Sequence, residues 1–281
     1  MVLNKKMQTK NKILIGGIIS KIICFFLSKR QFVKRNGISW QLDLTEGIDL
    51  SNFLFGSSEK KIVNLRKIFN SDKKLIFLDI GANIGSVSLP LAKLFNNALI
   101  YSIEPTTYAF SKLYKNLSLN KNLKKQILIH QLFISDKKDP KKVWSSWNFD
   151  KNKNKHHKHK GNLKSIKANS RISLDDFIKI NKIKKVDFIK LDVDGYEMDV
   201  FKSGNKFFRK NKPIIFIELA PYLYPEFGCT CLDLIKFIKK LGYNFFDENL
   251  KKITDIKKTV NLIKDGSSRN FFLIKEHMAL V

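Results

Sequence analysis

Acidic residues, arginine and cysteine are scarce in this 281-residue sequence. Its 53 Lys and Arg outnumber its 25 Asp and Glu, which gives a formal net charge of +28. Six of the basic residues are arginine, the better side chain for binding phosphates and bases, and the lysines are spread along the whole chain. We therefore expect solvated lysine faces and no specific nucleic-acid partner, although the charge favours anionic partners in general.

Cysteine and histidine are too few, or too poorly placed, for a disulfide framework or a metal site. Cys24, Cys229 and Cys231 cannot form a four-cysteine zinc site, which favours reduced thiols in a reducing compartment. The histidines in the run KNKNKHHKHK at 151–160 have no carboxylate or cysteine partner nearby. We predict no metal site, and we expect residues 151–162 to form a basic flexible insertion.

Long apolar runs are also missing. The run at 13–27 has 15 residues and contains Lys21, whereas a membrane-spanning helix needs about 20 residues. No small-residue cleavage site follows Leu27, so a signal peptide is not predicted. We expect residues 1–31 to form a basic and apolar N-terminal helix packed on the domain, in a cytoplasmic protein. The alternative is peripheral contact of residues 1–35 with an anionic membrane at its inner face.

Apolar residues are sufficient for one sizeable core, since 43% of the residues are hydrophobic and 12% are aromatic. Apolar runs that suit buried parallel strands alternate with segments of helical spacing after a hairpin pattern at 32–44. This alternation predicts an α/β, doubly wound Rossmann-like fold with a mostly parallel seven-stranded sheet and an antiparallel edge. Strands are predicted at 75–80, 99–103, 127–134, 186–191, 214–219, 243–247 and 271–275, and helices at 59–69, 86–95, 108–119, 196–203 and 231–240.

The most specific local pattern is FLDIGANIGS at 77–86, a strand that runs into a glycine turn and then a helix. Gly81 and Gly85 permit backbone conformations and a close approach of a ligand that a Cβ would obstruct, and the helix start offers free amides. Asp79 stands at the carboxyl end of the strand, where open parallel sheets bind ligands. The spacing D-x-G-x-N-x-G differs from the dinucleotide pattern G-x-G-x-x-G.

A second strand-end acid follows. Glu104 closes the strand at 99–103, 19 residues after Gly85. A carboxylate at this offset commonly accepts hydrogen bonds from ribose hydroxyls. The glycine turn and Glu104 together predict a crevice that binds a nucleoside.

With these motifs the chain resembles the FkbM-type methyltransferase family, within the class I S-adenosylmethionine-dependent enzymes. The resemblance covers residues 32–275, within a predicted methyltransferase domain at 32–281, and it implies S-adenosyl-L-methionine as cofactor. The motifs that carry it are Asn36-Gly37-Ile38, Leu42-Asp43-Leu44, Ile48-Asp49, Phe55-Gly56, the turn DIGANIG at 79–85, Glu104-Pro105, Ile134-Ser135-Asp136, Ser173-Leu174-Asp175-Asp176, IKLDVDGYE at 189–197, and the segment 213–218.

The resemblance also implies roles for individual residues. Glu104 would hold the ribose, and Ser135 and Asp136 would lie beside the adenine. The residues that would enclose the methionine part of the cofactor are Asp79, Gly81, Ala82, Asn83 and Gly85. By the same resemblance, the acceptor would be a hydroxyl of a sugar, a glycan or another small secondary metabolite.

Three carboxylates are candidates for the reaction itself. Methyl transfer depends mainly on placement of the acceptor, and an acceptor hydroxyl must also lose a proton. Asp192, Asp194 and Glu197 are therefore predicted catalytic residues, although the family more often has Glu at the position of Asp194. The order D-V-D-G-Y-E predicts Asp192 and Asp194 on the same side of an extended strand end. Both helix-start acids have an alternative role. Asp194 could cap the following helix by accepting hydrogen bonds from its backbone N–H groups, and Glu197 could interact with the positive end of that helix.

Two other functions stay open at this point. A nicotinamide-dependent oxidoreductase would share the strand, the turn and the ribose acid, but it should show the dinucleotide glycine spacing. A non-catalytic nucleoside-binding protein would share the fold and differ only in an assay.

Overall fold

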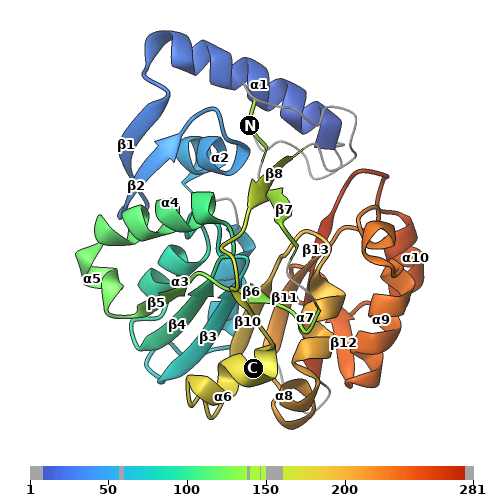
Figure 1. The fold of residues 1–281 in the computed structure, drawn as a ribbon. Helices are drawn as coiled ribbons and strands as arrows, with labels where there is room; N and C mark the ends of the chain where they lie inside the picture. Colours follow the sequence, from blue (N-terminus) through green and yellow to red (C-terminus); the bar gives the residue numbers. More distant parts are fainter. Residues whose placement is uncertain (1–8, 57–59, 138–139, 146, 150–160, 276–281) are drawn as a thin grey trace.

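The computed structural model describes residues 9–56, 60–137, 140–145, 147–149 and 161–275. A seven-stranded sheet forms its centre, in the order β12-β13-β11-β10-β3-β4-β5 (Figure 1). Adjacent strands from β11 to β5 are parallel, and β13 pairs antiparallel with both β11 and β12. The strands are β3 (Leu75–Ile80), β4 (Ala98–Ile103), β5 (Ile127–His130), β10 (Phe188–Leu191), β11 (Ile214–Leu219), β12 (Tyr243–Phe246) and β13 (Arg269–Lys275).

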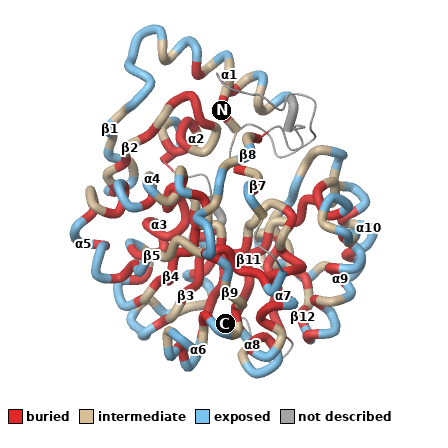
Figure 2. Tube along the Cα trace, viewed as in Figure 1, coloured by how far each residue is buried: buried red, intermediate tan, exposed pale blue. Residues whose placement is uncertain are grey.

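Apolar side chains cover both faces of this sheet. All four residues of β10 are buried, and β3, β4 and β11 each bury all but one residue. Helices on both faces exclude water from such strands, which explains their continuous Ile, Leu and Phe runs. Figure 2 shows the strands mostly buried between the two layers. One layer contains α3 (Ser88–Leu94) and α5 (Lys121–Lys124), and the other contains α6 (Leu174–Ile180), α7 (Glu197–Ser203), α8 (Asn205–Lys210), α9 (Cys231–Lys240) and α10 (Ile256–Asn261).

The predicted fold class is confirmed, and one predicted strand is wrong in extent. The run at 127–134 divides into β5 and β6 (Phe133–Ile134), and β6 pairs with β9 (Arg171–Ile172) outside the central sheet. The run divides because the neighbouring strand β4 ends at Ile103, which pairs with His130. Beyond His130 the chain has no strand to pair with in the central sheet, so it turns away.

Several shorter elements differ from the prediction or were not predicted. The segment predicted as a helix at 59–69 contains a 3₁₀ helix, η1 (Lys60–Lys67). The helix α2 (Gly47–Phe55) has nine residues, too few for a clear helical period. The hairpin of β7 (Lys142–Ser145) and β8 (Asn162–Ser165) flanks the predicted insertion at 151–162, of which residues 151–160 lie outside the described residues.

The N-terminal helix packs on the domain. The helix α1 (Thr9–Phe26) lies across one end of the molecule, next to α2 and the β7–β8 hairpin (Figure 1). The strand β1 (Arg30–Arg35) follows α1 and pairs with β2 (Ile38–Asp43). The predicted boundary after residue 31 therefore falls inside β1. Among the residues that the structure describes, no helix combines the length and the apolar character needed to cross a membrane.

Candidate active site

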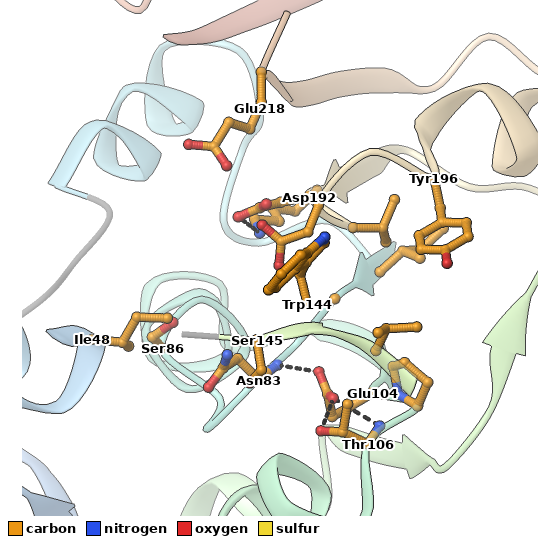
Figure 3. A pocket seen from close by; sticks show the side chains of 18 of the residues that line it. Ile48, Asn83, Ser86, Glu104, Thr106, Trp144, Ser145, Asp192, Tyr196 and Glu218 are labelled. Carbon is orange, nitrogen blue, oxygen red and sulfur yellow. Dashed lines mark hydrogen bonds and ion pairs between the residues drawn. The ribbon is translucent and has the colours of Figure 1, made fainter. Parts of the chain in front are cut away.

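A cavity of about 390 Å³ opens at the carboxyl ends of β4, β3, β10 and β11, four neighbours in the sheet. Each of these strands contributes lining residues at or just past its end, as expected for ligand sites of open parallel sheets. Figure 3 shows Glu104 on one side of this cavity and Asp192 and Glu218 on the other. Further lining residues come from α1, α2, the β7–β8 hairpin and the segment after β11: Lys12, Gly47, Ile48, Ser51, Val143, Trp144, Ser145, Ala220 and Tyr222.

Glu104 is fixed at the β4 end of the cavity by three hydrogen bonds. Its Oε1 accepts from the backbone N–H of Thr106 at 2.9 Å and from the hydroxyl of Thr106 at 2.6 Å. Its Oε2 accepts from the backbone N–H of Asn83 at 3.0 Å. Burial nevertheless raises the pKa of Glu104 above its ordinary value. The carboxylate therefore joins the glycine turn to the β4 end, with its orientation set before any ligand binds.

The glycine turn is required by packing of the protein on itself. Gly81 has φ +87°, and a Cβ there would lie 1.8 Å from the backbone carbonyl oxygen of Asp192. Gly85 has φ +88°, and its Cβ would lie 2.9 Å from Cδ1 of Leu113. The close approach that we predicted to be with a ligand is thus, at both positions, with another part of the chain. Gly81 lets the loop after β10 lie directly against the loop after β3.

Asp79 lies behind this turn, out of the cavity lining. Its side chain is fully buried, and its Oδ2 accepts a hydrogen bond from the hydroxyl of Ser88. Burial raises the pKa of Asp79, while the positive charge of Lys190 on the neighbouring strand opposes that rise. The other oxygen, Oδ1, has no hydrogen-bond partner among the described residues. Beneath the glycine turn, Oδ1 of Asp79 is therefore a buried hydrogen-bond acceptor without a partner among the described residues.

Lys190, Asp192 and Glu218 form a chain of charged groups at the opposite end of the cavity. Nζ of the buried Lys190 lies 2.7 Å from Oδ2 of Asp192. Glu218, at the end of β11, accepts a hydrogen bond from the hydroxyl of Ser268 and is hydrogen-bonded to Asp192. Burial and the adjacent Asp192 carboxylate raise the pKa of Glu218 well above its ordinary value. Two carboxyl groups this close share a proton, and the ammonium of Lys190 favours the charge on Asp192.

Asp194 completes a group of three carboxylates. One oxygen each of Asp192, Asp194 and Glu218 lies within 4.8 Å of the others, and these are the described residues that could hold a cation. Asp194 adopts φ +49°, so it lies in a tight turn and not on the extended strand end that we predicted. The turn brings Asp192 and Asp194 to the same cavity all the same.

Glu197 lies apart from the cavity lining, at the start of α7. It is 2% exposed, and its Oε1 accepts from the backbone N–H groups of Val193 and Gly195 at 3.2 and 3.4 Å. Its Oε2 has no partner among the described residues. Burial raises the pKa of Glu197 from 4.5 to about 8. The side chain therefore holds the loop that carries Asp192 and Asp194.

This raised pKa predicts a pH dependence of stability. Between pH 4.5 and about 8 the folded state keeps a proton on Glu197 that the unfolded chain has released, so stability falls as pH rises through that window. Glu197→Gln removes the titrating group. We expect the free energy of unfolding of this variant to change less between pH 4.5 and about 8 than that of wild-type, by about a few kcal/mol. Urea unfolding at the two pH values measures this difference. The matched control is Asp72→Asn, at an exposed carboxylate. An unchanged pH dependence in the Gln variant would contradict the assignment.

The cavity brings together some of the predicted site residues. Gly81, Asn83, Glu104, Asp192 and Asp194 line it. The other predicted site residues do not line it: Asp79, Ala82, Gly85, Ser135, Asp136 and Glu197. Ser135 is buried and accepts a hydrogen bond from the backbone N–H of Lys137, whereas Asp136 is exposed. At that end of the cavity the lining side chains are the apolar residues just before them, at 132–134.

Sequence reasoning missed several lining residues. Lys190 is part of the quoted motif, and its position inside an apolar strand, two residues before Asp192, could have marked it as a buried partner. The sequence leaves Trp144 and Trp147 undecided between stacking on a sugar and packing the domain, and both line the cavity from the segment of β7. Tyr196 and Tyr222, which sequence reasoning missed, line it from the loops after β10 and β11. These aromatic residues are far apart in the sequence, and only the sheet order shows that they meet.

Comparison with known proteins gives the family. None of the curated proteins compared matches this sequence. The N-terminal domain of human METTL16 in complex with SAH shares 11% identity at a TM-score of 0.46, over 95% of this chain and 83% of that one. M. jannaschii TYW2 in complex with AdoMet shares 17% identity at a TM-score of 0.39, over 88% and 85%. Precorrin-6y C5,15-methyltransferase from Geobacter metallireducens GS-15 shares 13% identity at 0.39, over 77% and 86%.

The family match is more specific than these likenesses. The methyltransferase FkbM domain matches residues 79–245, more than half of the chain. The matched segment begins at Asp79 and includes the glycine turn, Glu104 and the carboxylates that end β10 and β11. The chain therefore belongs to the FkbM methyltransferase family of S-adenosyl-L-methionine-dependent enzymes.

Proposed function

We propose that this methyltransferase acts on oxygen, at a hydroxyl of a sugar, a glycan or a similar polyhydroxylated metabolite. The observation that carries this proposal is Asp192, a carboxylate held by Lys190 at the end of the cavity opposite Glu104. An acceptor hydroxyl must lose its proton as it is methylated, and a carboxylate with a defined orientation serves that step.

The β3 and β4 end of the cavity suits the cofactor. Glu104 presents a fixed carboxylate for ribose hydroxyls. Asn83 and Gly81 would line the methionine part, and Leu132 and Phe133 offer apolar contact for the adenine. S-adenosyl-L-methionine, when bound, supplies an activated methyl group and leaves as the neutral thioether S-adenosylhomocysteine.

The β10 and β11 end suits the acceptor. As the acceptor oxygen bonds to the methyl carbon, its proton passes to the Asp192 carboxylate. Burial and the Asp192 carboxylate raise the pKa of Glu218, which favours its protonated form. That form donates a hydrogen bond to Asp192 and avoids two adjacent negative charges. Glu197 has no place in the cavity lining, so we propose that it positions the loop and does not contact the acceptor.

Aromatic side chains favour a sugar ring as the acceptor. Trp144, Trp147 and Tyr222 line the cavity beside the carboxylates, and Figure 3 draws Trp144 between Asp192 and Glu104. Aromatic rings offer apolar faces to the C–H face of a sugar, while carboxylates accept hydrogen bonds from its hydroxyls. This combination of groups supports a polyhydroxylated acceptor.

The assignment of Glu104 is tested by cofactor binding. Glu104→Ala removes a charged acceptor of hydrogen bonds, which contributes about 1.5–3 kcal/mol, so we expect S-adenosylhomocysteine to bind about tenfold to a hundredfold more weakly in calorimetry. Glu218→Gln, at the other end of the same cavity, is the matched control and should bind S-adenosylhomocysteine as wild-type does. Equal affinity in Glu104→Ala and wild-type would contradict the ribose assignment, and tight NAD binding would favour an oxidoreductase.

The acceptor class is tested by incubating the protein with methyl-labelled cofactor and fractionated glycans, RNA and protein from cells. We expect label in the glycan fraction, on a methyl ether that survives mild alkali. Label released by alkali would indicate methyl esters on carboxyl groups, and label in nuclease-sensitive material would move the acceptor to nucleic acid. Cofactor binding with no transfer to any fraction would favour a non-catalytic binding protein.

A further inference from the structure

The outward side of α1 carries the largest apolar side chains of that helix. Leu14, Ile18, Ile22, Phe25 and Phe26, which we call the α1 stripe, are between 52% and 84% exposed. They recur every three or four residues apart from the last pair, so they lie along one side of the helix. Figure 2 shows much of α1 exposed or half-buried.

The inward side of α1 carries the small residues Gly16 and Ser20, and the partly buried Ile23 and Cys24 pack against the core. Gly16 packs so closely on Phe149 that a Cβ there would lie 2.9 Å from Cζ of the ring. Ser20 is buried, and its hydroxyl donates a hydrogen bond to the backbone oxygen of Leu44 at 2.8 Å. A helix on a water-soluble domain ordinarily buries its large apolar residues and exposes its polar ones. In α1 five large apolar side chains are left exposed, so the orientation of the helix presents the α1 stripe outward.

The charge around the α1 stripe indicates what covers it. The first 42 residues contain nine Lys and Arg and no Asp or Glu. Lys21, Lys29 and Arg30 are exposed next to the stripe. A second copy of this chain would bring the same cations and a net charge of +28 to the contact, and the two copies would repel each other. Apolar side chains bordered by lysines match the surface of a bilayer that contains anionic lipids.

We propose that α1 binds in the plane of an anionic membrane surface. The α1 stripe would enter the boundary between headgroups and acyl chains, and the flanking lysines and arginines would contact lipid phosphates. The small-residue side of α1 keeps the methyltransferase domain attached to the helix in this position. The proposal concerns attachment to the surface, since no described helix could span the membrane.

This attachment would place the active site close to the lipid. Lys12 of α1 lines the cavity together with Gly47 and Ile48 of α2. A helix with its side chains is about 10–12 Å across, so the rim of the cavity would lie about that far from the bilayer. If the proposed function holds, acceptors carried at a membrane surface would be within reach of the site.

The test is binding of the full chain to vesicles, measured by flotation. Wild-type protein should bind vesicles of phosphatidylcholine mixed with phosphatidylglycerol, and should bind phosphatidylcholine alone much less. Ile18→Glu with Ile22→Glu should weaken binding to the anionic vesicles about tenfold or more, because two apolar side chains that would enter the membrane are lost. The matched control is Ile180→Glu with Leu262→Glu, which makes the same change in charge at two apolar residues that are 68% and 74% exposed outside α1.

Two results would overturn the proposal. The first is equal vesicle binding by wild-type protein and by the α1 variant, with both proteins shown to be folded by thermal unfolding. The second is a wild-type dimer in sedimentation equilibrium that the α1 variant dissociates, since a second copy would then cover the stripe. Vesicle binding needs no acceptor or cofactor, so its failure is distinct from failure of the proposed function.

Discussion

Asp192→Asn is expected to lower kcat for methyl transfer by about a hundredfold to ten-thousandfold, the usual contribution of a general base. The amide cannot take the proton of the acceptor hydroxyl. Its oxygen can still accept a hydrogen bond from Lys190, whose Nζ lies 2.7 Å from Oδ2 in the wild-type protein, so the fold should persist. The measurement is single-turnover transfer of labelled methyl to the acceptor that the labelling experiment identifies.

The matched control for this variant is Glu218→Gln. Burial and the Asp192 carboxylate raise the pKa of Glu218, which favours its protonated form. Glutamine keeps a donor to Asp192, so we expect a loss of about tenfold or less. Equal losses in the two variants would show that the carboxyl pair acts as a unit, and an active Asp192→Asn enzyme would remove Asp192 from the role of base. Cofactor affinity should be unchanged in both.

Gly81→Ala is expected to destabilise the fold by on the order of 5 kcal/mol, an exceptional loss for one methyl group. The added Cβ would lie 1.8 Å from the carbonyl oxygen of Asp192. The backbone cannot easily yield on either side, because the N–H of Gly81 donates to Ile103 O at 2.9 Å and the N–H of Asp192 donates to Ile80 O at 3.2 Å. Since domains of this kind are stable by about 5–15 kcal/mol, we expect poor accumulation of the variant and a much lower urea midpoint.

Gly242→Ala separates backbone strain from the clash. Gly242 has φ +84°, close to the +87° of Gly81, and a Cβ there would have no atom within 4 Å. The left-handed conformation alone costs an alanine about 1–2 kcal/mol. The difference between the two variants therefore measures the contact between the loops after β3 and β10. A difference below about 1 kcal/mol would mean that the loops can separate at little cost.

Much of the fold follows from local sequence patterns. The strands β3 and β11 and the helix α9 have the predicted bounds, because each is a single apolar or amphipathic run between clear boundaries. The 3₁₀ helix η1 and the division of the run at 127–134 were not predictable in this way. Both depend on neighbours that are distant in the sequence, such as the end of β4 at Ile103.

The candidate site also contains residues that local motifs predicted and residues whose positions they did not predict. Glu104 and Asp192 were predicted from motifs in which an acid follows a strand, and both line the cavity. The position of Asp79 was not predictable, because the motif places it at a strand end but does not say on which side of the glycine turn its carboxylate lies. The sequence marks Glu218 as another strand-end acid, which could order the acceptor or pair with a lysine, but its hydrogen bond to Asp192 was not predictable.

The sequence by itself determined the α/β fold, the nucleoside crevice and the family, because periodicity and strand-end motifs are local properties of the chain. The tertiary structure decided which side chains meet. It placed β11 beside β10, which brings Glu218 to Asp192, and it turned the glycine and serine side of α1 inward, which leaves the α1 stripe in contact with water. Contacts between strands and the orientation of a helix depend on packing across the whole domain, and no local pattern contains that information.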